Sequence, residues 1–242
     1  MDPNQNVPRI QGGASLILAW QIKDKPVLVI GGGSVASSRV ENLLAADAEI
    51  TVIAPTLSST LQCRLDRGEI SYISRKCDLS IDLGSPRPSM VLVAIDDPIA
   101  SSEIYKACHD LHIPVNVADV PPECDFYFGS MYRDGPLQIM VSTNGNGPKM
   151  ASLVRKRIEN ELANDPFGIA IEKLGALRAQ VRLKLPGSEK SAIRARMRWV
   201  SLLSEKWTIS QLAALDDNII SYLVSHLDSD PPTYEAAVRS CN

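Results

Sequence analysis

Aromatic side chains are scarce in this chain: Phe, Trp and Tyr together make up 5% of its 242 residues. Proteins that stack nucleic-acid bases rely on such side chains, so the composition argues against nucleic-acid binding. The net charge of −3 argues the same way, because there is no overall basic field to attract a nucleic acid or an anionic membrane. We therefore expect neither as a partner.

Long hydrophobic runs are also missing. Residues 15–22 are apolar but too few to span a bilayer, and neither a compact basic segment nor a clear cleavage site marks them as a signal peptide. We expect these residues to form a packed helix that precedes the first strand.

Metal-ligand spacings are not found either. The five cysteines are scattered and odd in number, with no Cys-x-x-Cys pair, which predicts reduced thiols in a cytoplasmic protein. The three histidines do not form a cluster with metal-ligand spacing; we expect His109 and His112 to pack or lie exposed on one helix. No protein-bound metal is therefore expected.

The most informative feature present is the junction of an apolar run with a glycine-rich turn. Residues 27–30, Val-Leu-Val-Ile, are typical of a buried strand in a parallel sheet. Residues 31–36 follow at once, fit Gly-x-Gly-x-x-Ala, and lead into a helix expected over residues 34–46. A strand, such a turn and a helix together predict dinucleotide binding.

Each small residue of that turn has an expected role. Gly31 permits the tight bend, Gly33 lets a pyrophosphate approach the backbone, and Ala36 lets helix and strand pack closely. The N–H groups that begin the helix favour the phosphates. The residues expected to contact the cofactor lie in this turn and after the next strands: Gly31, Gly33, Ser34, Val35, Ala36, Ala54, Pro55, Thr56 and Ile95.

Alternating strand and helix signals fill the first half of the chain, so we predict an α/β fold with a Rossmann-like, doubly wound parallel sheet. Ligands of such sheets bind beyond the carboxyl ends of the strands. The expected strands are 49–54, 69–74, 90–95 and 113–118; the expected helices are 57–66 and 98–111, with a loop over 78–88.

The pattern changes after Asp119. Two strands, 125–132 and 137–143, are predicted to form a hairpin, followed by a helix over 149–162 and four or five helices from 165 onward. We therefore predict three domains: residues 1–118 bind the nucleotide, 119–150 form a small α+β domain, and 151–242 are helical. The hairpin carries more apolar surface than it can bury alone, which predicts a homodimer; the residues are Phe126, Phe128, Met131, Ile139 and Met140.

Four motifs in register carry a family resemblance: residues 31–36, 116–119, 124–128 and 142–145. Together they closely resemble the bifunctional precorrin-2 dehydrogenase/sirohydrochlorin ferrochelatase family, in its stand-alone fungal form. The resemblance spans residues 15–160 and, more loosely, the helical tail. No part of the chain resembles the methyltransferase domain of the bacterial sirohaem synthases.

The resemblance implies an enzyme that oxidises precorrin-2 to sirohydrochlorin with NAD⁺ and then inserts ferrous iron, its second substrate, to give sirohaem. It also implies a homodimer and a role in sulfite reduction and methionine biosynthesis. The family's catalytic carboxylate falls on Asp119. The substrate-binding residues expected by the resemblance, together with polar and basic neighbours suited to many substrate carboxylates, are Asn116, Ser142, Thr143, Asn144, Gly145, Lys149 and Arg155.

The chemistry of Asp119 agrees with that role. A carboxylate directly after a buried strand lies at the mouth of the nucleotide cleft, where it can accept a proton as hydride leaves and later accept pyrrole N–H protons. The alternative is that Asp119 only caps a turn. Asp96 and Asp97 have a similar position, but helix capping explains them.

Other functions remain open at this stage. The chain could be a dehydrogenase alone, or a non-catalytic Rossmann protein that senses NAD(H) or a tetrapyrrole. A short-chain dehydrogenase is disfavoured, because no Tyr-x-x-x-Lys pair follows the sheet. Gly147 replaces a serine that bacterial family members can phosphorylate, which excludes that modification here.

Cofactor preference must be inferred without the usual acidic residue. About twenty residues after the glycines, where NAD-specific Rossmann proteins carry Asp or Glu, residues 53–56 read Ile-Ala-Pro-Thr. No basic residue stands there to pair with a 2′-phosphate, and the nearest downstream is Arg64. We expect a modest preference for NAD⁺.

Overall fold

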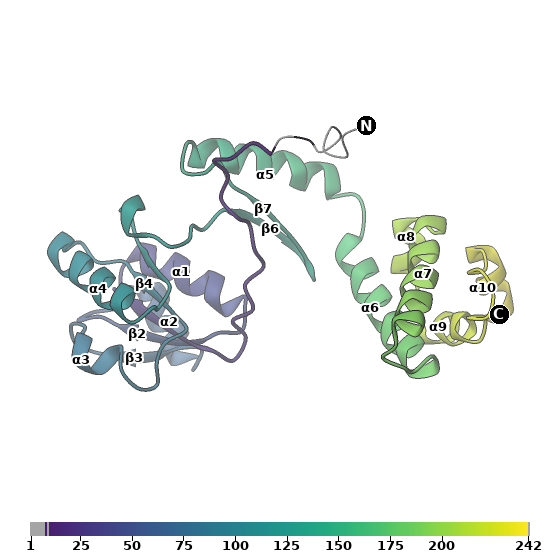
Figure 1. Cartoon of the computed structure of the whole chain (residues 1–242), viewed down its shortest axis with the longest axis horizontal. Coiled ribbons are helices and arrows are strands. Elements are labelled where there is room, and N and C mark those ends of the chain that lie inside the picture. Colours follow the sequence, from purple (N-terminus) through teal and green to yellow (C-terminus); the bar gives the residue numbers. More distant parts are fainter. Residues whose placement is uncertain (1–7, 9, 242) are drawn as a thin grey trace, which may run out of the picture. The chain divides into compact units, whose positions relative to one another are not determined.

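The computed structural model describes residue 8 and residues 10–241. These described residues form two compact units, which divide between Phe128 and Gly129, each with its own secondary structure (Figure 1). Residues 119–128, expected in a separate central domain, belong to the first unit. No helix of the described residues is long and apolar enough to cross a membrane.

A five-stranded parallel sheet forms the centre of the first unit, in the order β3-β2-β1-β4-β5. The chain builds β1, β2 and β3 outward in one direction, and then returns past β1 to build β4 and β5, so the predicted doubly wound sheet is confirmed. The bounds of the strands are β1 Pro26–Ile30, β2 Glu49–Ile53, β3 Ser71–Ile73, β4 Met90–Val93 and β5 Val115–Val117.

Successive strand residues point to opposite faces, and each face has its own core. Val29 packs in one core with Val40 of α1, whereas Leu28 packs in the other with Ile104 of α4. Helices therefore cover both faces of the sheet, as the apolar strands require. The bounds of the helices are α1 Ser34–Leu44, α2 Ser59–Asp66, α3 Leu79–Asp82, α4 Pro98–Asp110 and the 3₁₀-helix η1 Pro121–Glu123.

Two predictions for the first unit are wrong. The loop expected over 78–88 contains α3, which begins because the Asp78 carboxylate accepts the Ser80 N–H. The helix expected over 15–22 does not form; these residues have no regular secondary structure, and most are exposed. The first turn of so short a helix is unfavourable to form, and the helix needs an apolar face packed on a core to be stable. Most of residues 15–22 are exposed and have no such packing.

The second unit begins with the predicted hairpin, β6 Ser130–Asp134 and β7 Leu137–Val141, in antiparallel register. The first strand starts later than expected, because residues 124–126 run beside β5 in the first unit instead. The predicted set of helices follows: α5 Pro148–Leu162, α6 Phe167–Lys184, α7 Lys190–Lys206, α8 Ile209–Ala213, α9 Asp217–Val224 and α10 Tyr234–Cys241.

Phe126 and Phe128 do not belong to the hairpin. Both pack against the core of the first unit, so the apolar surface that the sequence assigned to the hairpin was overestimated. The hairpin is held to α6 by Asp134, whose carboxylate accepts the Gly168 N–H at 2.7 Å. The helical part has its own core around Leu177, Leu203 and other residues of α6–α10.

Candidate functional site

The glycine-rich turn follows β1 and lies between the ends of the two strands that flank β1, which are β2 and β4. Gly31 has a φ of +125°, and a Cβ there would stand 2.0 Å from the Ala94 carbonyl oxygen. At Gly32 a Cβ would stand 1.9 Å from the Thr56 carbonyl oxygen. Only glycine fits at either position. The bend expected at Gly31 is therefore observed, while the equal need for glycine at Gly32 was missed by the sequence analysis.

Gly33 is different, because a Cβ built there has no heavy atom within 4 Å. The turn is therefore open to a ligand at Gly33, where α1 begins without a side-chain cap and without an acid in its first turn. Unpaired N–H groups and the helix dipole favour a phosphate at such a place. Ala36 is fully buried against the sheet. These residues fit the pyrophosphate of a dinucleotide.

Two serines hold the turn in shape. The Ser58 N–H donates to the Gly32 carbonyl at 2.8 Å. The Ser37 hydroxyl donates to the Gly33 carbonyl at 3.0 Å and lies 2.9 Å from the Ser58 hydroxyl. Ser58 also caps α2 by accepting the Leu61 N–H. A capping serine before a helix is visible in the sequence, but its contact with the turn is not.

The ends of β2 and β4 border the same edge. Pro55 and Thr56 are exposed there, Ala54 is buried, and Ile95 is half-buried. Arg64, the nearest basic residue downstream of β2 in the sequence, is not a free cation, because its guanidinium donates to the Glu69 carboxylate at 2.8 Å.

The acids after β4 behave as expected from capping. The Asp97 carboxylate accepts the Ala100 N–H at the start of α4, and Asp96 is exposed.

Asp119 lies just past the carboxyl end of β5. Because β5 is parallel to β4, and β4 to β1, this places Asp119 at the edge of the sheet that carries the glycine-rich turn. Its φ is +61°, a left-handed conformation that non-glycine residues adopt at a cost, and its side chain is exposed. Such conformations are concentrated at functional sites, where surrounding structure holds a side chain in a required direction.

The segment after Asp119 is held against β5. Asn116 is 4% exposed, and its amide donates to the Phe126 carbonyl at 2.8 Å and to the Cys124 sulfur at 3.3 Å. Val115 donates its N–H to the Asp125 carboxylate. The Asn116 amide nitrogen therefore has a structural role, and its contact with a substrate stays a prediction.

The predicted Ser-Thr-Asn-Gly turn lies in the second unit. Asn144 and Gly145 have positive φ values of 53° and 80°. The Ser142 oxygen accepts the Asn144 N–H, and the Thr143 oxygen accepts the Gly147 N–H. Each hydroxyl can still donate its own proton to a ligand.

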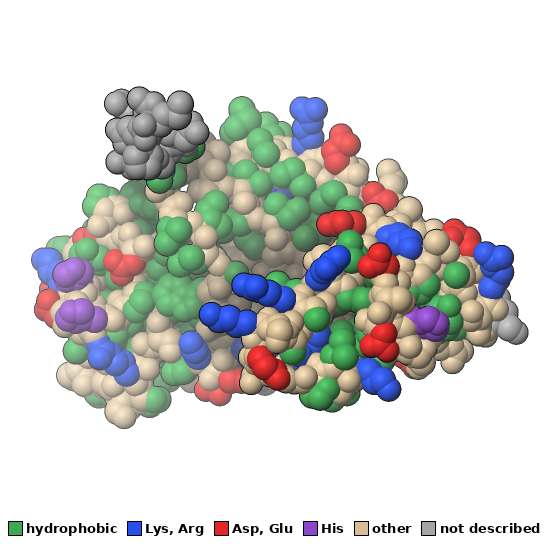
Figure 2. Space-filling view, turned by 45° about the vertical axis from the view of Figure 1, so that its right-hand side comes forward, with side chains coloured by type: hydrophobic (Ala, Val, Ile, Leu, Met, Phe, Trp, Pro, Cys, Tyr) green, Lys and Arg blue, Asp and Glu red, His purple; other side chains and the backbone are tan. Residues whose placement is uncertain are grey.

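The basic residues expected to bind substrate differ in their surroundings. Lys149 is exposed in the first turn of α5, whereas the half-buried Arg155 pairs with Glu159 one turn on. Across the face shown in Figure 2, Lys and Arg side chains lie among Asp and Glu side chains.

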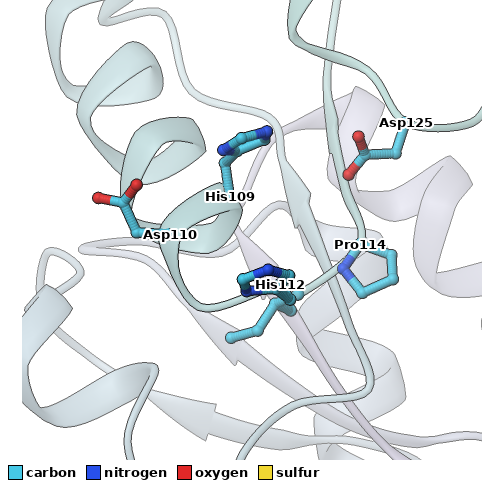
Figure 3. Close-up of a pocket in the computed structure, with 6 residues that line it drawn as sticks. His109, Asp110, His112, Pro114 and Asp125 are labelled. Atoms are coloured by element: carbon cyan, nitrogen blue, oxygen red, sulfur yellow. The ribbon is translucent and has the colours of Figure 1, made fainter.

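The pocket shown in Figure 3 lies elsewhere. Its volume is about 500 Å³, and His109, His112 and Asp125 line it around the segment that enters β5. This is the amino end of the strand, opposite the edge with Asp119. No group of three or more His, Cys, Asp or Glu among the described residues is placed to hold a metal ion.

Three of the five cysteines are held in the unreactive thiol form by burial. Burial raises the pKa of Cys77 to about 12 and that of Cys108 to about 12, and it also raises the pKa of Cys124. Thiols with raised pKa values stay protonated at neutral pH.

Comparisons with known proteins match the chain in three parts. Residues 18–130 match a family model for NAD(P)-binding, 134–161 one for the sirohaem biosynthesis protein central region, and 164–231 one for the sirohaem biosynthesis protein C-terminal region. The "Siroheme biosynthesis protein met8" of Schizosaccharomyces pombe is 48% identical over 230 residues, covering 93% of this chain and 84% of that protein.

More distant relatives agree. The "Siroheme synthase" of Psychrobacter sp. (strain PRwf-1) is 33% identical over 70% of this chain, which spans about a third of that protein (34%). Among solved structures, "SirC, precorrin-2 dehydrogenase" is similar with a TM-score of 0.62 and 20% identity, covering 94% of this chain and 98% of that one. At this identity the likeness concerns the fold.

Proposed function

The chain belongs to the sirohaem biosynthesis protein family, and on that premise we propose that it oxidises precorrin-2 to sirohydrochlorin with NAD⁺ and then inserts ferrous iron to give sirohaem. It is an NAD-binding enzyme of this pathway. The observation that carries the dehydrogenase function is the meeting of a dinucleotide turn and a carboxylate, Asp119, at one edge of the sheet.

Oxidation of precorrin-2 removes a hydride and a proton. When bound, NAD⁺ supplies the hydride acceptor. The turn around Gly33 holds the pyrophosphate, and the exposed ends of β2 and β4 border the rest of the nucleotide, with Thr56 toward a ribose. Asp119 accepts the proton, which is the work of a general base placed within reach of substrate.

Iron insertion needs a base as well. Two pyrrole N–H protons leave as Fe²⁺ enters, and the tetrapyrrole nitrogens then hold the metal. Asp119 accepts these protons one after the other in the proposed mechanism and passes the first to water before it takes the second, so that one exposed carboxylate serves both reactions at one site. Iron is a substrate here, so a resident metal site in the protein is not required.

The substrate carboxylates require fixed positive potential and hydrogen-bond donors. The turn before α5 supplies hydroxyl and backbone N–H donors, and the start of a 15-residue helix follows it. We assign substrate binding to Asn116, Ser142, Thr143, Asn144, Gly145, Lys149 and Arg155. To bind a substrate carboxylate, Arg155 would have to leave Glu159 or donate to Glu159 and to the substrate at the same time.

A homodimer is part of the proposal. Met131 of the hairpin is exposed, and α5 exposes Met150, Leu153 and Val154. Exposed apolar side chains on a hairpin and on the helix that follows it are typical of surfaces that a second copy covers. Cytoplasmic placement is proposed from the reduced thiols that the cysteine pattern predicts.

Dehydrogenase activity alone is the nearest alternative, and a non-catalytic sensor is the next. A purified-protein assay separates all three. Precorrin-2 and NAD⁺ are mixed with the protein and followed by absorbance, and Fe²⁺ is then added. The proposal expects sirohydrochlorin and then sirohaem. Sirohydrochlorin without accelerated iron insertion would indicate a dehydrogenase alone, and no oxidation would indicate a sensor.

A further inference from the structure

Arg39 lies near Asp119, the candidate catalytic residue. Arg39 itself was not predicted from the sequence. It lies on α1, just after the glycine-rich turn, and its guanidinium carbon is 4.2 Å from the centre of the Phe128 ring. Phe128 in turn contacts Phe126 edge-to-face, and Phe126 contacts Trp20 in the same way. The guanidinium therefore has a fixed platform on the side of the sheet where the segment after Asp119 packs.

The donors of Arg39 are unused. Among the described residues, no carboxylate lies within ion-pair distance of its guanidinium, and no hydrogen bond from it is found. Arg64 and Arg75 in the same unit are paired with Glu69 and Asp82. Arg39 is thus half-buried on an aromatic ring, with its planar set of N–H donors open to a ligand.

Asp119 is one of the charged groups near enough to Arg39 to affect its charge. Burial lowers the pKa of Arg39, while the nearby Cys124 and Asp119 raise it in partial compensation. The group stays charged at neutral pH, because arginine does not lose its proton in proteins. A partly desolvated cation without a partner is costly, and an anionic ligand would remove that cost.

We propose that Arg39 binds a carboxylate side chain of the tetrapyrrole substrate and so positions the macrocycle at Asp119. This inference rests on the proposed function, because it takes a polycarboxylate as the ligand. A carboxylate matches the guanidinium fork with two parallel hydrogen bonds, and the Phe128 ring keeps the fork in one orientation. The cofactor phosphates have their own donors at Gly33 and the start of α1.

The test is the affinity of the purified full chain for sirohydrochlorin, measured by titration for wild type, Arg39→Met and Arg67→Gln. Methionine keeps an apolar side chain on Phe128 and removes the charge and the donors. We expect Arg39→Met to bind sirohydrochlorin about 10- to 100-fold more weakly, as for a lost charged hydrogen-bond pair. Arg67→Gln removes the same charge from an exposed side chain, and its affinity should equal that of wild type.

NAD⁺ titration and thermal unfolding of the same variants complete the design. Arg39→Met should keep wild-type affinity for NAD⁺. Equal sirohydrochlorin affinity of Arg39→Met and wild type would overturn the inference and leave the proposed function intact. Weaker NAD⁺ binding with unchanged sirohydrochlorin binding would also overturn it, by assigning Arg39 to the cofactor phosphates. If wild type itself fails to bind sirohydrochlorin, the proposed function fails.

Arg39→Lys decides the matter should Arg39→Met not fold. Lysine retains the charge and the long stem but lacks the fork. The inference expects a several-fold loss of sirohydrochlorin affinity in Arg39→Lys at unchanged NAD⁺ affinity, and an unchanged sirohydrochlorin affinity would overturn bidentate binding by Arg39.

Discussion

Gly32 and Thr56 are in backbone contact: a Cβ at Gly32 would lie 1.9 Å from the Thr56 carbonyl oxygen. This contact packs the dinucleotide turn against the segment that follows β2. It leaves no room for a side chain at Gly32. The next glycine, Gly33, has open space instead. These neighbouring glycines are thus required for different reasons: Gly32 for the fold, and Gly33 for the approach of the ligand.

Gly32→Ala should therefore destabilise the protein, because backbone must move to admit the methyl group. We expect a loss of at least about 2 kcal/mol in the free energy of unfolding. Gly33→Ala is the matched control and should change stability little, since its φ of −86° is ordinary for alanine. Denaturant unfolding of both variants measures the difference, and equal stability would contradict the account of the turn.

Gly33→Asp should separate the two reactions. A carboxylate at the open position repels the pyrophosphate by bulk and charge, so dehydrogenation should fail in a folded protein. Insertion of iron into supplied sirohydrochlorin should continue, because it needs no nicotinamide. Assays of both reactions on one preparation test this, and a joint loss of both would argue against separable use of one site.

Replacing either of two glycines of α6 by alanine should change the stability of the protein, in opposite directions for the two. A Cβ at Gly168 would lie 2.4 Å from an Asp134 carboxylate oxygen, whereas one at Gly175 meets nothing within 4 Å. Gly168→Ala should cost about 1–3 kcal/mol of stability by disturbing the link between the hairpin and α6. Gly175→Ala should stabilise the helix by about 0.5–1 kcal/mol. Thermal unfolding of the two variants should move the midpoint in opposite directions.

Cofactor preference follows from the end of β2. No acid follows β2 directly to select the ribose, and Arg64, the nearest basic residue downstream of this strand end, is paired with Glu69. A 2′-phosphate would lose water without gaining a partner. We expect kcat/KM to favour NAD⁺ over NADP⁺ by about 10- to 100-fold, or about 1.4–3 kcal/mol. Equal efficiency with both cofactors would mean that Arg64 leaves Glu69, or that another basic side chain reaches this strand end, to bind the phosphate.

The sequence predicted the sheet well because β1, β2 and β4 are short apolar runs, largely buried, that lead into turn signals, whereas the edge strand β3 is short and mostly exposed. It failed at residues 15–22, where apolar composition was taken as a helix although no periodic stripe supports one. It also failed at Phe126 and Phe128, whose alternation fits a strand but whose packing depends on a long-range pairing between Asn116 and Cys124. Local pattern cannot reveal such pairing.

In the candidate site, too, residues marked by a local motif were predicted, and a residue that depends on long-range packing was not. Gly31, Gly33 and Asp119 were predicted because a motif and a strand end mark them. Arg39 was not, because its significance lies in a ring from a distant part of the chain and in the absence of an ion-pair partner among the described residues. Unused donors are visible only once the surrounding side chains are placed.

The most direct test of the central claim is the activity of Asp119→Asn. Asparagine tolerates the left-handed backbone at this position and keeps the size of the side chain, but it cannot accept the proton. Turnover of precorrin-2 and of sirohydrochlorin with Fe²⁺ is measured beside NAD⁺ affinity, with Asp119→Ala as the fuller deletion. The account predicts that both rates fall by roughly 10²–10⁴-fold while NAD⁺ affinity is unchanged. Near wild-type rates in Asp119→Asn would contradict it and leave Asp119 as the cap of a turn.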